Sequence, residues 1–87
     1  MALVFSARGC IQGLLDFEAA LARAEAASGI IPRTAAESIA SECRAELFDE
    51  DALSQGAAVA GNLAIPLVRM LTDLVGKRDS EAAGWVH

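Results

Sequence analysis

The chain has 87 residues, of which 54% are hydrophobic, and its formal net charge at pH 7 is −5. Lysine and arginine are few and scattered, which argues against nucleic-acid binding, and no apolar run is long enough to span a membrane. A chain this short forms at most one domain and buries only about 60–65% of its unfolded surface. The high apolar content therefore predicts that part of the surface faces another subunit or further chain.

The two cysteines, Cys10 and Cys43, lie far apart in the sequence and belong to no Cys-x-x-Cys motif or Cys/His cluster. A zinc site is therefore not expected. The N-terminus also lacks the charged and apolar regions of a secretory signal. We predict a cytoplasmic protein with reduced thiols, in which both cysteines are small core residues.

The first predicted helix runs from about Arg8 to Ser28, after an apolar lead at residues 1–5 that we expect to form an extended arm. Gly13 lies inside this helix and indicates a close helix crossing. The apolar residues expected to face the core are Cys10, Leu14, Phe17, Leu21 and Ala24.

Two glutamates, Glu18 and Glu25, lie beside that apolar face. Seven helical residues separate them by about 10.5 Å along the axis. This distance is too wide for two carboxylates to act on one bond. We interpret them as residues that form salt bridges to a neighbouring helix or subunit.

The middle of the chain contains signals for two further helices. Residues 34–37, Thr-Ala-Ala-Glu, have the pattern of a capping box at the start of a short helix. Leu47 and Phe48 are predicted to be buried anchors after it. The acidic run at residues 49–51 is predicted to start a helix that ends at Ala60, because carboxylates complement the positive end of the helix dipole. This run lacks the glycine and the distal glutamate of a calcium loop.

Residues 61–75 form the stretch around which we expect the molecule to be organised. Gly61 and Asn62 end the preceding helix, and Pro66 is suited to the first turn of the next, which should end at Gly76. The apolar face of that helix is Leu67, Leu71, Leu74 and Val75. Because the turn before it is too apolar for an ordinary exposed loop, we predict a buried loop that leads into a helix N-terminus. Such a place is suited to binding, since unpaired N–H groups point there.

The end of the chain adds one short element and one candidate residue. Ser80 is predicted to cap a last helix before Trp85-Val86-His87. His87 is the only histidine, and histidine titrates near neutral pH, which makes it a candidate for function. Helical patterns with short connections fill the chain, so the predicted fold is all-α. We expect a small bundle of four to five short helices in one domain, residues 1–87.

Several sequence blocks, in this order, resemble the N-terminal segment of bacterial 3-carboxy-cis,cis-muconate cycloisomerases, which belong to the fumarase/aspartase superfamily. The blocks are Met-Ala-Leu-Val-Phe-Ser, Leu-Leu-Asp-Phe-Glu-Ala-Ala-Leu-Ala-Arg-Ala-Glu, Gly-Ile-Ile-Pro, Cys-Arg-Ala-Glu-Leu-Phe-Asp, Ala-Gly-Asn-Leu-Ala-Ile-Pro-Leu-Val-Arg and Gly-Trp-Val-His. The resemblance implies domain 1 of that superfamily. It also implies lactonisation of carboxymuconate in aromatic degradation by a homotetramer that binds a small polycarboxylate and needs no metal or organic cofactor.

In that family, Trp-Val-His leads into a Trp-Gly-Ala-Thr-Ser-Gln-Asp loop. A later Gly-Ser-Ser signature carries the serine proposed as general base. This sequence contains neither segment. The resemblance therefore implies an N-terminal fragment of the enzyme that carries no catalytic residue of its own and is inactive alone.

The resemblance implies substrate-binding roles for individual residues. His87 matches the histidine that heads the substrate loop. Asn62 stands where adenylosuccinate lyases have a histidine and where the cycloisomerases have Gly-Asn, so its amide is expected to bind a substrate carboxylate. Arg69 is a weaker candidate, in register with an arginine of the same helix, and we interpret it as structural through pairing with Asp73.

Two other hypotheses stay open from the sequence. In the first, the parent protein would be another lyase of the superfamily, such as an adenylosuccinate-lyase-like enzyme, or a cycloisomerase of a substituted muconate. This stays open because most residues that decide the substrate lie outside this sequence. Alternatively, the chain is a non-catalytic helical interaction module whose excess apolar surface binds a partner helix.

Overall fold

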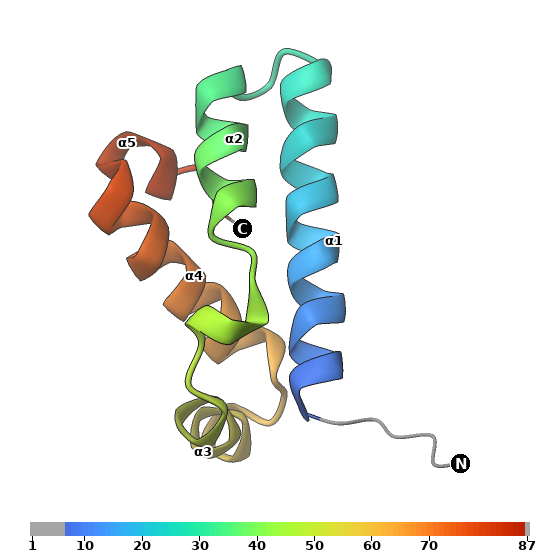
Figure 1. Ribbon diagram of the computed structural model, residues 1–87, viewed down its shortest axis with the longest axis vertical. Helices are drawn as coiled ribbons and strands as arrows, with labels where there is room; N and C mark the ends of the chain where they lie inside the picture. Colours follow the sequence, from blue (N-terminus) through green and yellow to red (C-terminus); the bar gives the residue numbers. More distant parts are fainter. Residues whose placement is uncertain (1–6, 87) are drawn as a thin grey trace.

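The computed structural model describes residues 7–86, and this part of the chain is helical without any strand (Figure 1). The elements are α1 (Ala7–Ala27), α2 (Arg33–Ser41), the 3-10 turn η1 (Ala45–Leu47), α3 (Glu50–Ala60), α4 (Ala64–Arg78) and α5 (Ser80–Ala83). The all-α prediction is confirmed for these residues. The arm predicted at residues 1–5 and the candidate His87 lie outside the described residues.

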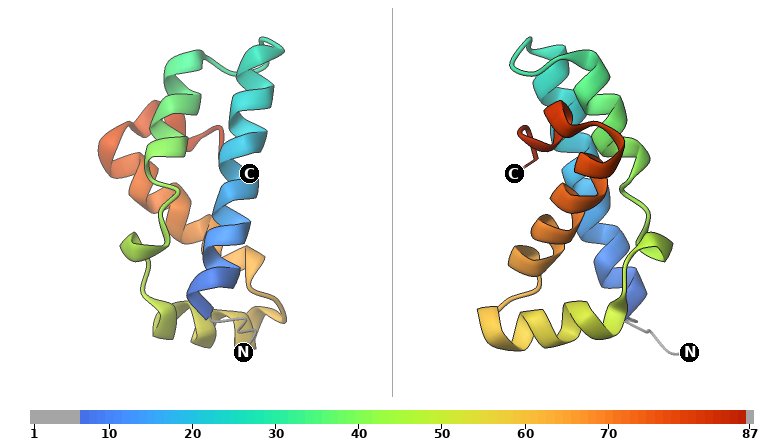
Figure 2. Two further views of the ribbon diagram at one scale, coloured as in Figure 1. Left: turned by 45° about the vertical axis from the view of Figure 1, so that its right-hand side comes forward. Right: turned by 90° about the vertical axis from the view of Figure 1, so that its left-hand side faces the viewer.

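The helices are arranged around a hairpin of α1 and α2, which run antiparallel and side by side (Figures 1 and 2). Gly29 in the connecting turn has φ 77°, a left-handed conformation that glycine adopts without strain. α3 lies across the far end of the hairpin, and α4 returns diagonally to α5, which packs on α2. The described part measures 41 × 27 × 21 Å.

One hydrophobic core contains side chains from all five described α-helices, α1 to α5. Its largest fully buried side chains are Ile11, Leu15, Ile39, Leu53, Leu67, Leu71 and Val75. The predicted apolar face of α4 is therefore confirmed, with Leu74 only partly buried against the core. Of the predicted core cysteines, Cys43 is buried and Cys10 is exposed, so the prediction is wrong for Cys10.

The predicted core face of α1 is wrong by one position. The side that faces the core is Ile11, Leu15, Ala19 and Ala22. Phe17, which we expected inside, is 62% exposed. The alanine-rich helix carries two apolar stripes next to each other, and α2 packs on the stripe with small residues. Gly13 is exposed with open space around it, so it marks no helix crossing.

The ends of the helices also differ in part from the predictions. The acidic run starts α3 as expected, and Asp49 caps the helix by accepting the N–H groups of residues 51 and 52. The capping box at Thr34 does not form, because α2 begins at Arg33 directly after Pro32 and places the threonine inside the first turn. Asp79 caps α5 in place of Ser80.

The two predicted anchors differ in burial, and α4 is longer than predicted. Phe48 is 7% exposed, which confirms it as an anchor, whereas Leu47 is 44% exposed and is not one. α4 does not end at Gly76 but continues to Arg78, which places Lys77 and Arg78 in its last turn. Positive charge at that end complements the helix dipole.

Candidate functional site

The candidate site is built around residues 61–66, which join α3 to α4. Gly61 ends α3 with φ 84°, and its N–H donates to the carbonyl of Ala57 at 2.8 Å. This left-handed conformation favours glycine and confirms the predicted stop of the helix. Pro66 is the third residue of α4, so it lies in the first turn as predicted.

The prediction that this segment is buried is wrong. Asn62 and Ala64 are exposed, and Ile65 is 49% exposed. The physical reason is that α4 already begins at Ala64, and the first fully buried residue of this helix is Leu67, which is 1% exposed. Ala64 and Ile65 form the outer side of the first turn, whereas Leu63 just before the helix is partly buried against the core. The positive end of α4 is therefore accessible from outside.

Asn62 is held in place by the start of α4. Its side-chain Oδ1 accepts the N–H of Ile65 at 3.1 Å and so satisfies one of the free donors at the helix N-terminus. With Oδ1 used in this way, the Nδ2 group carries the remaining donors of the amide. No partner for these donors lies among residues 7–86. Asn62 thus presents N–H donors outward at the positive end of a helix, where an anion is favoured.

A groove of about 470 Å³ follows this segment between α3 and α4. Its lining residues are Ala52, Gln55, Gly56, Val59, Ala60, Ile65, Pro66 and Arg69. Val59 is 91% exposed, so the groove has an apolar rim. The helices touch closely at its floor, where a Cβ on Gly56 would lie 2.8 Å from Cβ of Pro66.

Arg69 supplies the positive charge on this groove. It is exposed, and the ion pairs formed within residues 7–86 do not include it, so the predicted pairing with Asp73 is not found. Its guanidinium is therefore available to an anion in the groove. Asn62 and Arg69 stand at the same end of α4, about two helical turns apart.

Gln55 and Val59 line the groove but were not predicted to be residues of the site. Their spacing from Leu53 could have identified them. Leu53 is fully buried, and Gln55 and Val59, two and six positions later, fall on the opposite side of α3. Val59 can be recognised as an exposed apolar residue only once Leu53 shows which side of α3 faces the core.

The third predicted site residue, His87, follows a segment that packs on α1. His87 lies outside the described residues, and the two residues before it, Trp85 and Val86, line a small hollow with Glu18 and Glu25 of α1. Figure 2 shows α5 beside α2, whereas residues 61–66 lie next to α3. Residues 85–86 and residues 61–66 thus lie at different places in the described part of the chain.

Other chemistry receives no support from the described residues. Burial raises the pKa of the Cys43 thiol from its ordinary value of 9.0 to about 11, and the charge of Glu18 acts in the same direction. Its Sγ donates to the carbonyl of Ile39 at 3.2 Å, so this cysteine is a structural thiol rather than a nucleophile. Residues 7–86 bring no three metal-binding side chains together. None of their helices is long and apolar enough to cross a membrane.

Comparison with known proteins confirms the resemblance along the whole chain. A 3-carboxy-cis,cis-muconate cycloisomerase of Pseudomonas aeruginosa is 56% identical over 87 residues, which is 100% of this chain and 19% of that protein. The enzyme of the same name from Bradyrhizobium diazoefficiens is 56% identical over 80 residues, 92% of this chain and 18% of that protein. No protein-family model matches the chain.

A solved structure confirms the fold. The crystal structure of the 3-carboxy-cis,cis-muconate lactonizing enzyme from Pseudomonas putida superposes with a TM-score of 0.93 at 51% identity, over 95% of this chain and 19% of that chain. The helices described above therefore have the fold of the corresponding part of a fumarase/aspartase-type enzyme. The chain spans about a fifth of the length of the curated relatives it matches.

Proposed function

We propose that residues 1–87 form the N-terminal domain of a 3-carboxy-cis,cis-muconate cycloisomerase, because this chain is homologous along its whole length to one part of such enzymes. The match over the whole chain to relatives of this one name is the observation that carries the proposal. The reaction we assign is lactonisation of 3-carboxy-cis,cis-muconate in the breakdown of aromatic compounds. A carboxylate oxygen adds across a conjugated double bond, and a proton is delivered to the α carbon.

The role of this domain is to supply one wall of an anionic binding site. The substrate carries three carboxylates, and the beginning of α4 offers outward N–H donors of Asn62 at a positive helix end. Arg69 adds a positive charge on the adjoining groove. Because Asn62 is fixed by its hydrogen bond to Ile65, its donors are oriented before the substrate arrives, which favours electrostatic stabilisation of developing charge.

We further propose that other subunits complete the site, in a homotetramer in the cytoplasm. Trp85 and Val86, which precede the proposed substrate-binding His87, line a hollow against α1, whereas residues 61–66 follow α3, so we expect neighbouring subunits to surround one substrate. The large apolar side chains exposed on the described part support this assembly. They are Phe17, Ile30, Leu47, Val59, Ile65 and Trp85, and covering them would remove apolar surface from water.

A hybrid enzyme tests the proposal. Residues 1–87 replace the matching segment of the Pseudomonas aeruginosa relative, which supplies the remaining four-fifths of the length. We expect the hybrid to lactonise 3-carboxy-cis,cis-muconate, followed as loss of the ultraviolet absorbance of the diene. The isolated 87-residue chain should show no turnover, because it lacks most of the groups that stabilise the transition state.

The unmodified relative is the control for assembly and rate. A hybrid with the same oligomeric state as the control that leaves the substrate unchanged contradicts the proposed function. Lactonisation by the isolated chain contradicts the proposal that the site needs further walls.

A further inference from the structure

α5 is the shortest helix of the described chain and depends on its neighbours for its position. It has only four residues, Ser80–Ala83, and helices of this length are not stable in isolation. One of its residues, Ala82, is 1% exposed in the core. The residues that fix α5 therefore decide where the chain leads afterwards.

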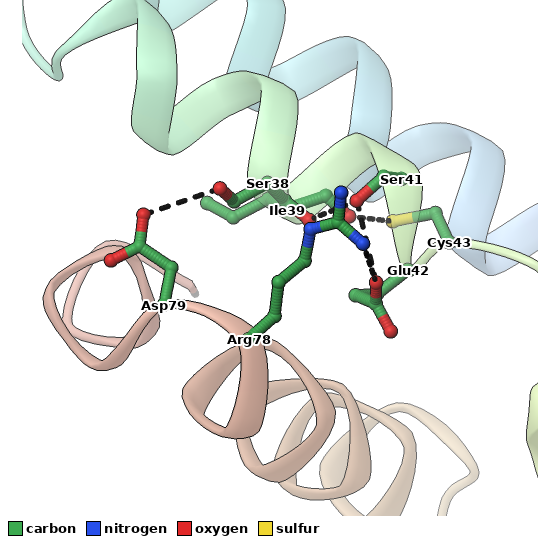
Figure 3. Close-up of polar contacts among 7 residues, drawn as sticks. All are labelled: Ser38, Ile39, Ser41, Glu42, Cys43, Arg78 and Asp79. Atoms are coloured by element: carbon green, nitrogen blue, oxygen red, sulfur yellow. Dashed lines mark hydrogen bonds and ion pairs between the residues drawn. The ribbon is translucent and has the colours of Figure 1, made fainter.

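One carboxylate, that of Asp79, joins α5 to α2. Its Oδ1 accepts the N–H groups of Glu81 and Ala82, each at 3.2 Å, and so caps α5. Its Oδ2 accepts the hydroxyl of Ser38 on α2 at 3.2 Å, and Figure 3 shows the two side chains pointing toward each other. The two oxygens thus bind two helices that are far apart in the sequence.

The ion pair next to this link does not involve α5. Arg78 Nη1 lies 3.5 Å from Glu42 Oε2, and the arginine side chain is 60% exposed. The Glu42 side chain is 15% exposed, and this pair joins the last turn of α4, not α5, to the residue after α2. Ser41 donates to Glu42 and to the carbonyl of Ser38, and its hydroxyl makes no hydrogen bond to Asp79. The specific connection between α2 and α5 is therefore the one from Ser38 to Asp79.

The direction of α5 determines where the end of the chain lies. Beyond the helix, the N–H of Trp85 donates to the carbonyl of Ala82 at 2.9 Å, and the N–H of Val86 donates to that of Ala83 at 3.3 Å. These bonds continue the helical turn, so Trp85 and Val86 move with α5. Both residues line the hollow against α1 that also contains Leu21.

We propose that Asp79 is a positioning residue that acts together with Ser38. Their hydrogen bond holds α5 against α2, fixes residues 84–86 beside α1, and through these residues affects substrate binding by His87. The last step rests on the proposed function, since it takes His87 as a substrate-binding residue. The first two steps concern the described residues alone.

The first test uses the 87-residue chain and the variant Ser38→Ala, which removes the hydroxyl and leaves the cap of α5 intact. We expect amide hydrogen exchange at Ala82 and Trp85 to rise about fivefold, the equivalent of one typical hydrogen bond. Exchange at Leu15 in α1 should stay unchanged. The fluorescence of Trp85, the only tryptophan, should shift toward the red as the indole becomes more exposed.

Two further variants separate this effect from a general loss of stability. Ser41→Ala removes a hydroxyl from the same helix without touching Asp79, so it should exchange like the parent chain. Ser38→Thr keeps the hydroxyl and should restore slow exchange at Ala82 and Trp85. Equal exchange in Ser38→Ala and Ser41→Ala overturns the proposal.

The second test measures the consequence for the substrate in the hybrid enzyme. Ser38→Ala should raise KM about fivefold with little change in kcat, because a displaced binding residue weakens binding more than chemistry. Ser41→Ala should leave both constants unchanged. An unchanged KM in an active Ser38→Ala hybrid overturns the link to His87. A parent hybrid without any activity refutes the proposed function and this last step with it, while the exchange experiment still decides the role of Asp79.

Discussion

The core between α1, α2 and α4 and the segment at residues 61–66 are both apolar, yet they differ in what covers them. Leu15, Leu71 and Val75 are 0% exposed in the core. On the groove beside residues 61–66, Val59 is 91% exposed and Ile65 is 49% exposed. The apolar side chains of the core thus contribute to folding, whereas those on the groove remain exposed and are available to contact another surface.

This difference separates stability from assembly. Burying a leucine or valine contributes about 1.5–3 kcal/mol to folding, whereas an exposed one contributes almost nothing in the isolated chain. Substitutions in the core should therefore change the free energy of unfolding. Substitutions around residues 61–66 should change what the domain binds.

The largest effect is expected in the core. Leu71→Ala should lower the free energy of unfolding by about 2–5 kcal/mol, because it removes a fully buried side chain and leaves a cavity. That is a large part of the total for a small domain, about 5–15 kcal/mol. Val59→Ala is the matched control and should stay within about 0.5 kcal/mol of the parent. Urea unfolding followed by circular dichroism measures both, and equal losses contradict the comparison.

A pair of glycines sharpens the comparison where the two regions meet. A Cβ on Gly56 would lie 2.8 Å from Cβ of Pro66, so Gly56→Ala should push α3 from α4 and destabilise by about 1–3 kcal/mol. Gly13 in α1 has open space, so Gly13→Ala should stabilise by up to about 1 kcal/mol through helix propensity. Thermal unfolding gives both signs. A rise in Tm for Gly56→Ala contradicts the close contact of the two helices.

The next effect depends on pH and concerns the buried thiol. The pKa of Cys43 is about 11 in the folded chain, against an ordinary value of 9.0. Between these values the folded chain holds the proton that the unfolded chain loses, so this contribution to stability is present below pH 9.0 and declines as the pH rises to about 11. Urea unfolding across this range should show the decline in the parent and a smaller decline in Cys43→Ala. The same slope in both chains contradicts the assignment.

The smallest effect on stability is expected in the segment at residues 61–66. Asn62→Ala removes the acceptor for the N–H of Ile65 and should cost about 1 kcal/mol, the typical value of a helix cap. The measurement is the urea midpoint of the 87-residue chain. A loss as large as that of Leu71→Ala would mean that this segment belongs to the folding core.

The buried face of a helix could be predicted where the sequence has only one apolar stripe. α4 has one apolar stripe from Leu67 to Val75, with Pro66 at its start, and its buried face follows from that spacing. α1 offers two stripes, so its face depends on the packing of α2, which no pattern within α1 specifies. Asp79 and Ser80 are neighbouring cap residues, and a shift of one residue decides between them.

The candidate site was predictable to a different extent. The place of Asn62 at the start of α4 followed from the resemblance together with the glycine and proline signals around it. Its hydrogen bond to Ile65 depends on the residue at which α4 begins, and the spacing of apolar residues does not determine that point. The segment was expected to be buried because it is apolar, but burial depends on which other surfaces are present.

The most direct test of the central claim separates the two functions of Asn62 in the hybrid enzyme. Asn62→Asp keeps an oxygen that accepts from Ile65, but it replaces the outward N–H donors with a negative charge. We expect Tm to stay close to that of the parent hybrid. The kcat/KM for 3-carboxy-cis,cis-muconate should fall at least about tenfold, since a hydrogen bond to a charged group contributes about 1.5–3 kcal/mol. Parental kcat/KM in a stable Asn62→Asp hybrid would contradict the claim that this segment forms a wall of the substrate site.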